Sequence, residues 1–234
     1  MLAPALCFSQ EVKNALLIAN NNYQGSIPSL AESVKKARDL KLALESIGFS
    51  VTIVENADRE RMEDALFNFG EKCKTEGGIA FFHYGGHAVQ IDGMLYLIPV
   101  SRNITNAMQA RFKCVNIADL MDCMQGDANV AIFDSARDNP FPPEKSRGIG
   151  RSSSTPNFVQ PSNSIILYST ESGTAPQDGI FTPILIRHIA EKNKSASDIF
   201  QMVCLEVSKK TSGKQNPCLY DKCLSHIYFA NPNK

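Results

Sequence analysis

The sequence lacks the bulk features of a nucleic-acid-binding or membrane protein. Lysine plus arginine and aspartate plus glutamate both number 24, so the formal net charge is zero. No long block of like charge occurs either, and we therefore expect neither a nucleic-acid partner nor an anionic membrane surface. No stretch approaches the roughly 20 apolar residues that a membrane-spanning helix needs, so we expect a soluble chain without a membrane partner.

Several ligand-binding patterns are also missing. Neither GxGxxG nor GxxxxGK[ST] occurs, which argues against a nucleotide-binding doubly wound domain. The seven cysteines include no CxxC pair, and Cys218 and Cys223 have no companion pair with which to hold a metal. We expect no cofactor and no metal site, while a dependence on calcium is left open. Buried reduced thiols, typical of a reducing compartment, are the expected state of the cysteines.

The start of the chain leaves the location with two interpretations. Residues 1–9 read MLAPALCFS, apolar and rich in small residues like the end of an export signal. They lack a basic start and the length of a full signal peptide. A cytoplasmic location is favoured, and export with a trimmed signal peptide is the alternative. Residues 1–11 are interpreted as an N-terminal segment before the domain.

Apolar strand-like runs alternate with helical patterns along the rest of the chain. Strands are predicted at 12–19, 49–54, 79–84, 129–134, 164–169 and 226–230. Helices are predicted at 30–47, 58–72, 117–124, 181–192 and 196–209, and a hairpin at 90–100 turns at Asp92-Gly93. This alternation predicts a single α/β domain with a six-stranded, mostly parallel sheet flanked by helices.

One segment differs from the others in composition. Residues 139–163 are rich in proline, serine and glycine, which predicts a surface loop of about 25 residues. This loop would link two parts of the same domain, residues 12–138 and 164–234.

Two predicted strands end in residues that can do chemistry. The third runs into HYGGHA at 83–88, and the fourth into DSARDN at 134–139. Ligands bind at the carboxyl ends of strands in open α/β sheets. A histidine there, His87, is well placed to move a proton. His83, His188 and His226 have no supporting motif and are expected to be structural.

Taken together, the two segments resemble the caspase-like cysteine proteases. Caspases carry a histidine about 50 residues before a cysteine that precedes arginine, glutamine or glycine, and His87 precedes Ala136-Arg137 by about that distance. The paracaspase and orthocaspase branch, related to metacaspases, reads His-Tyr-x-Gly-His and Asp-x-Cys-Arg-x-Asn-Pro-Phe. This chain has HYGGH at 83–87 and DSARDNPF at 134–141. Further matches at 15–23, 88–100, 166–185 and 211–219 extend the resemblance over nearly all of residues 12–230.

The resemblance implies a caspase-like three-layer sandwich and peptide-bond hydrolysis by a Cys-His dyad. His87 would partner a thiolate at position 136, and backbone N–H groups near Gly86 and Ala88 would form the oxyanion hole. Asp134 would line the S1 pocket of an enzyme that cleaves peptides or proteins after arginine or lysine.

Two further implications concern the assembly and processing of the chain. The parts before and after the loop would correspond to the large and small subunits of a caspase. By analogy with caspases, a homodimer would form through the last strand. The resemblance also leaves two interpretations of Lys145, Arg147 and Arg151, as self-processing sites or as scattered residues of a tether.

This chain departs from the family pattern at the nucleophile. Ala136 cannot form an acyl-enzyme, and the side chain of Ser135 is expected to point elsewhere. Because the surrounding motif is intact, we favour a deliberate Cys→Ala inactivation of a protease. The alternative is a natural pseudoprotease that binds peptides or proteins.

The pocket shows two more departures. Lys36 aligns with a second S1 aspartate of many relatives and would repel a basic side chain. An exposed lysine on a helix face is an equally open interpretation. Ala175 stands where some relatives carry a third acid, although Glu171 and Asp178 are near it in sequence.

Overall fold

The computed structural model describes residues 11–25, 27–137 and 160–230. The predicted processing residues Lys145, Arg147 and Arg151 lie outside the described residues, as do most of the predicted N-terminal segment and loop. Within the described ranges, no helix has the length and apolar character needed to cross a membrane.

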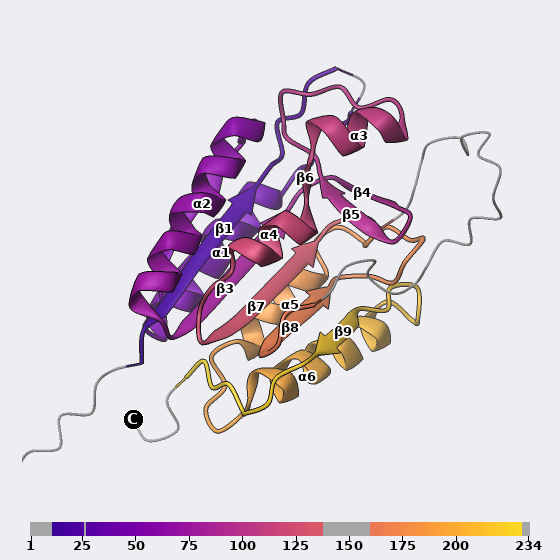
Figure 1. Ribbon diagram of the computed structural model, residues 1–234. Helices are drawn as coiled ribbons and strands as arrows, with labels where there is room; N and C mark the ends of the chain where they lie inside the picture. The colour runs from indigo at the N-terminus through magenta and orange to yellow at the C-terminus, as the bar shows by residue number, and fades with distance from the viewer. Residues whose placement is uncertain (1–10, 26, 138–159, 231–234) are drawn as a thin grey trace, which may run out of the picture.

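The predicted six-stranded α/β sheet is confirmed, with strand order β2-β1-β3-β7-β8-β9 (Figure 1). All pairs are parallel except β8 with β9. Every residue of β1 and β3 is buried, because helices cover both faces of the sheet. The strands are β1 (Lys13–Ala19), β2 (Ser50–Glu55), β3 (Ile79–Gly85), β7 (Ala128–Asp134), β8 (Ser164–Tyr168) and β9 (Cys218–Asp221).

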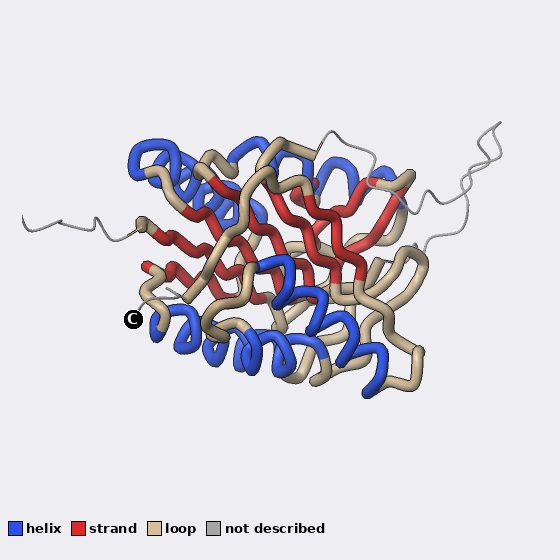
Figure 2. The backbone as a smooth tube through the Cα atoms, turned by 90° about the horizontal axis from the view of Figure 1, so that it is seen from below, coloured by secondary structure: helices blue, strands red, loops and turns tan. Residues whose placement is uncertain are grey.

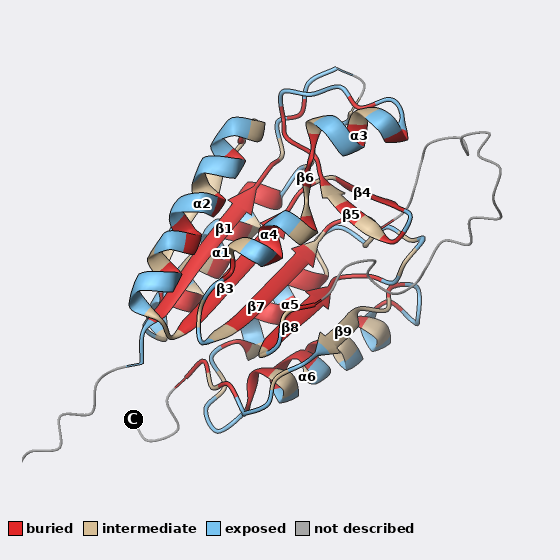
Figure 3. Ribbon diagram, viewed as in Figure 1, coloured by how far each residue is buried: buried red, intermediate tan, exposed pale blue. Residues whose placement is uncertain are grey.

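Figure 2 shows the strands as a layer between two layers of helices. One core packs α1, α5 and α6 on one face of the sheet, and a second core packs α2 and α4 on the other. The exposed faces of these helices turn away from the sheet (Figure 3). The helices are α1 (Ser33–Ser46), α2 (Arg59–Glu76), α4 (Ile117–Cys123), α5 (Phe181–His188) and α6 (Ala196–Lys210).

A second, three-stranded sheet lies beside the carboxyl ends of the large sheet. The predicted hairpin is confirmed as β4 (Ala88–Ile91) and β5 (Met94–Leu97). Asp92 and Gly93 both have positive φ, as a type I′ turn requires. Sequence patterns did not predict β6 (Val115–Asn116) or the short helix α3 (Ala107–Lys113).

Local signals explain where two helices begin. Asp58, the first residue of the predicted helix, caps α2 by accepting a hydrogen bond from the backbone N–H of Arg61, the third residue of α2. At the start of α6, Ser195 and Asp198 form a reciprocal capping box. At their C-terminal ends, α6 stops one residue beyond its predicted end, whereas α5 stops at His188 instead of the predicted residue 192.

The predicted strand at 226–230 is wrong, and the sixth strand is β9. The backbone of 226–230 has other partners, since Ala196 N–H donates to the Ile227 carbonyl and Lys13 Nζ donates to the Phe229 carbonyl. The side chains still alternate over 226–229, with Ile227 and Phe229 buried in the core. A strand-like pattern therefore reports burial on one side but not which backbone groups pair.

Phe229 provides a test of this core. Its ring lies between 5.7 and 6.0 Å from the rings of Phe49, Phe81 and Phe200. We expect Phe229→Ala to lower the free energy of unfolding by about 3–5 kcal/mol, because it leaves a cavity among rings that cannot collapse. Urea denaturation measures this loss. Leu224→Ala, at a side chain that is 90% exposed, should change it by less than about 0.5 kcal/mol.

Candidate active site

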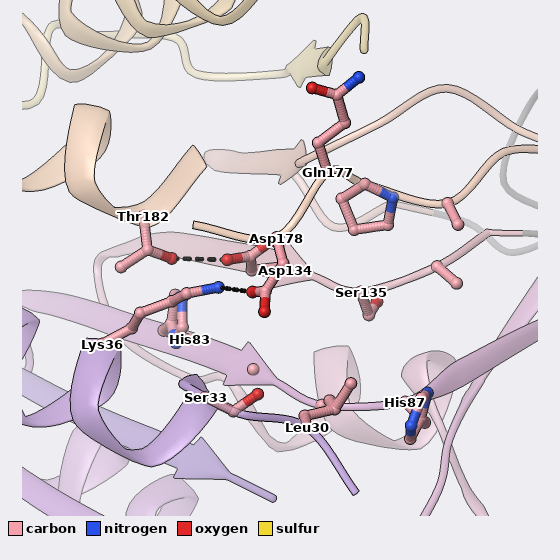
Figure 4. Close-up of a pocket in the computed structure, with 15 residues that line it drawn as sticks. Leu30, Ser33, Lys36, His83, His87, Asp134, Ser135, Gln177, Asp178 and Thr182 are labelled. Carbon is pink, nitrogen blue, oxygen red and sulfur yellow. Dashed lines mark hydrogen bonds and ion pairs between the residues drawn. The ribbon is translucent and has the colours of Figure 1, made fainter. Parts of the chain in front are cut away.

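One cavity of about 170 Å³ lies at the carboxyl ends of β3 and β7. It opens on the sheet face that carries α1 and α5. Figure 4 shows side chains from segments far apart in the sequence pointing toward this one space. The residues that line it are Leu30, Ser33 and Lys36 near the start of α1, His83 and 85–87 at the end of β3, 134–136 at the end of β7, and 175–178 with Thr182 near the start of α5.

Strand register explains why these residues meet. Gly85 pairs with Asp134, and His83 pairs two residues earlier with Ile132. Side chains alternate along a strand, so His83 and Asp134 face the same side of the sheet as the buried Phe81 and Ile132. The apolar core on this face therefore ends in a polar cavity.

His87 is held at one end of the cavity by several contacts. Its Nε2 lies 2.8 Å from the carbonyl oxygen of Pro28, and its ring packs edge-on against Tyr23. A carbonyl oxygen only accepts hydrogen bonds, so Nε2 carries a hydrogen in this contact. The backbone N–H of His87 donates to the Tyr23 hydroxyl at 2.7 Å, and its carbonyl accepts from Tyr84.

A glycine is required beside this histidine. A Cβ on Gly86 would lie 2.6 Å from the hydroxyl oxygens of both Tyr23 and Tyr84. Those two hydroxyls hold the backbone of His87, so a larger residue at position 86 would displace them. The glycine in the HYGGH motif thus serves the placement of the histidine.

Asp134 is the half-buried acid at the end of β7 that lines the cavity. Its Oδ2 accepts a hydrogen bond from the Thr182 hydroxyl at 2.7 Å. Burial raises the pKa of this carboxyl, and the charge of Lys36 and the Thr182 hydrogen bond only partly offset that effect. An acid held in this way attracts a cation that enters the cavity.

Lys36 also points into the cavity (Figure 4), which favours the interpretation of a pocket residue over that of an exposed helix-face residue. Its side chain is only 13% exposed, and its Nζ lies 2.5 Å from Oδ1 of Asp178. The hydrogen bond from Lys36 lowers the pKa of Asp178.

His83 was expected to be structural, yet it lines the cavity. Neither ring nitrogen has a hydrogen-bond partner among the described residues. Burial, followed by the nearby charge of Lys36, lowers the pKa of His83 to about 3, so the ring is neutral. The alternation of β3 could have revealed this position, because it places His83 on the face of Gly85.

The other predicted site residues divide into two groups. Ala136, Gly86 and Asp178 line the cavity together with His87, Asp134 and Lys36. Two residues are not among those that line it: Ala88 pairs with Leu97 in the small sheet, and Glu171 accepts a hydrogen bond from Asn216.

The residues beside Ala136 turn away from solvent. Ser135 is buried, and its hydroxyl has no partner among the described side chains and backbone groups. The Arg137 guanidinium is buried against the ring of Tyr168, 3.9 Å from its centroid, and donates to Gln90 and the Thr170 carbonyl. Position 136 thus lies between two buried side chains and lines the cavity. Ser135, which was expected to point elsewhere, lines it as well.

Comparison with solved protein structures identifies this α/β fold as that of a caspase. Caspase-1 from Spodoptera frugiperda superimposes with a TM-score of 0.72 over 96% of this chain and 92% of that chain, at 14% sequence identity. That likeness establishes a caspase-like fold.

The family follows from the sequence. The caspase domain model matches residues 12–228, so the chain belongs to the caspase-domain family of cysteine peptidases. Comparison with curated protein sequences finds no match.

The raised pKa of Asp134 yields a prediction about stability. A carboxyl whose pKa is higher in the folded than in the unfolded state favours folding at low pH and opposes it once the pH rises through the folded-state pKa. We therefore expect Asp134→Asn to raise the melting temperature at pH 7, and the gain to shrink toward pH 4. A gain that is equally large at pH 4 would contradict the burial of a charged carboxylate as its cause. Thermal melts across this pH range provide the measurement.

Proposed function

We propose that this fold carries the site of a cysteine endopeptidase whose nucleophile position is occupied by Ala136. The observation that supports this is the single cavity in which His87, Asp134 and residue 136 meet. We further place the chain in the paracaspase and orthocaspase branch, on the strength of HYGGH at 83–87 and DSARDNPF at 134–141.

In the parent enzyme, a cysteine at position 136 would attack the carbonyl carbon of a peptide bond. The imidazole of His87 would take the thiol proton and return it to the leaving amine, which leaves an acyl-enzyme for water to hydrolyse. Backbone N–H groups beside the cavity, at Gly86 and residue 136, would stabilise the oxyanion.

The chain as it stands would form no acyl-enzyme, because a methyl group cannot attack a carbonyl. Ser135 lines the cavity but offers no substitute, since its buried hydroxyl has no base within hydrogen-bond distance among the described residues. A cavity that keeps its histidine and acid but lacks a nucleophile would bind a peptide without cleaving it. The intact surroundings of Ala136 favour an introduced Cys→Ala change, and a natural pseudoprotease that binds peptides is the alternative.

Asp134 supports a basic residue as the P1 side chain of the peptide. A half-buried carboxylate gains most from a cation that also donates hydrogen bonds, which favours arginine and lysine over neutral residues. Two further proposals remain. By analogy with caspases, a homodimer would form through the last strand, which is β9 at the outer edge of the sheet. The expected reduced cysteines favour a cytoplasmic location.

Restoring the nucleophile tests the proposal. We expect Ala136→Cys to cleave fluorogenic peptides with arginine or lysine at P1, and not those with aspartate. His87→Ala in the same background should lower kcat/KM by about 10²–10⁴-fold, because the thiol loses its base. Asp134→Asn should lower kcat/KM for the basic reporters and spare neutral ones, because the P1 cation loses the carboxylate of the cavity.

Ser135→Cys is the matched control, since it places a thiol one residue away on a buried side chain. It should cleave none of the reporters. Failure of Ala136→Cys to cleave any reporter, together with tight peptide binding by the original chain, would support the pseudoprotease instead.

A further inference from the structure

The cavity contains a positive charge of its own. The ammonium of Lys36 shares the cavity with two carboxyl groups, those of Asp134 and Asp178, and contacts that of Asp178 directly. Lys36 is the more buried partner of this ion pair, with 13% of its side chain exposed against 60% for Asp178. The lysine thus extends from α1 into the cavity, whereas its partner stays at the rim.

The charge of Lys36 reaches both polar residues at the sheet side of the cavity. It opposes the rise in the pKa of Asp134, and it adds to the fall in the pKa of His83. The neutral ring of His83, with no partner for either nitrogen among the described residues, lies beside this ammonium and cannot share the positive charge. Lys36 is therefore the cation whose charge acts on both Asp134 and His83.

We propose that Lys36 determines the selectivity of this site, because its ammonium already supplies the charge that Asp134 and Asp178 would otherwise take from a basic P1 side chain. An entering arginine or lysine must approach Lys36 or displace it from Asp178, and like charges brought together in a poorly hydrated space repel strongly. This inference rests on the proposed function, since it requires that the cavity receive a peptide side chain.

The consequence is a site whose acids favour a basic side chain and whose lysine reduces that preference. The original chain should bind basic peptides only slightly better than neutral ones of similar length. Removal of the Lys36 charge should reveal the full attraction of the two carboxylates. A neutral P1 side chain such as methionine should be nearly indifferent to the change.

Peptide binding to the complete, uncleaving chain tests this directly. The probes are fluorescently labelled tetrapeptide amides that differ only in the last residue, arginine, lysine, methionine or aspartate. We expect Lys36→Met to tighten binding of the arginine and lysine probes on the order of tenfold, and to leave the methionine probe within about twofold. Fluorescence anisotropy gives the dissociation constants.

Lys35→Met is the matched control. Lys35 is the adjacent residue of α1, its side chain is 75% exposed, and it pairs with Asp39 outside the cavity. The variant removes the same net charge, so it should leave every dissociation constant unchanged. Asp178→Asn should change the affinity for the arginine probe in the opposite direction to Lys36→Met, because it removes one carboxylate and leaves the Lys36 charge without its partner. It should weaken binding of the arginine probe and spare the methionine probe.

The outcomes separate this inference from the proposed function. If Asp134→Asn abolishes the preference for arginine while Lys36→Met leaves the arginine-to-methionine ratio as it was, the selectivity role of Lys36 is overturned and the peptide site stands. If no probe binds the original chain, Lys36→Met or Asp178→Asn, all with unchanged melting temperatures, the peptide site itself is overturned and this inference with it.

Discussion

The parallel pairing of β3 with β7 is the interaction on which the rest of the site depends. Its register sets Gly85 opposite Asp134 and carries both strands to the same edge of the sheet. A shift by one residue would turn Asp134 and His83 to the opposite face, because side chains alternate along a strand. The register is held by the two apolar cores, since each face of these strands is covered by its own set of helices.

From that register, three kinds of contact build the cavity. Tyr23 and Tyr84 hold the backbone of His87 from the far face, and the absence of a side chain at Gly86 lets them approach. Thr182 of α5 contacts Asp134, which ties the second half of the chain to the first. Lys36 enters from α1 and pairs with Asp178. None of these contacts involves the side chain of residue 136, so His87 and Asp134 are held in place with alanine at that position.

Much of this was predictable from the sequence, for identifiable reasons. Buried parallel strands are short apolar runs, so β1, β3, β7 and β8 were recognised at nearly their observed bounds. The hairpin followed from Asp92-Gly93, because few other pairs tolerate two consecutive positive φ angles. One predicted strand is wrong, because 226–230 alternates like a strand but its carbonyl groups accept hydrogen bonds from the Ala196 N–H of α6 and from Lys13. Alternation reports which side chains are buried and carries no information on the backbone partner.

The sequence by itself determined the α/β fold, the family and the pair of motifs that meet at the candidate site. These depend on local patterns and on spacing along the chain. Only the tertiary structure decided which neighbours surround that pair. It placed His83 in the cavity wall, excluded Glu171 and Ala88 from the lining, and turned Lys36 inward toward Asp178. The reason is physical: the charge and polarity of a pocket are set by side chains from distant segments, and their proximity depends on strand register and helix packing.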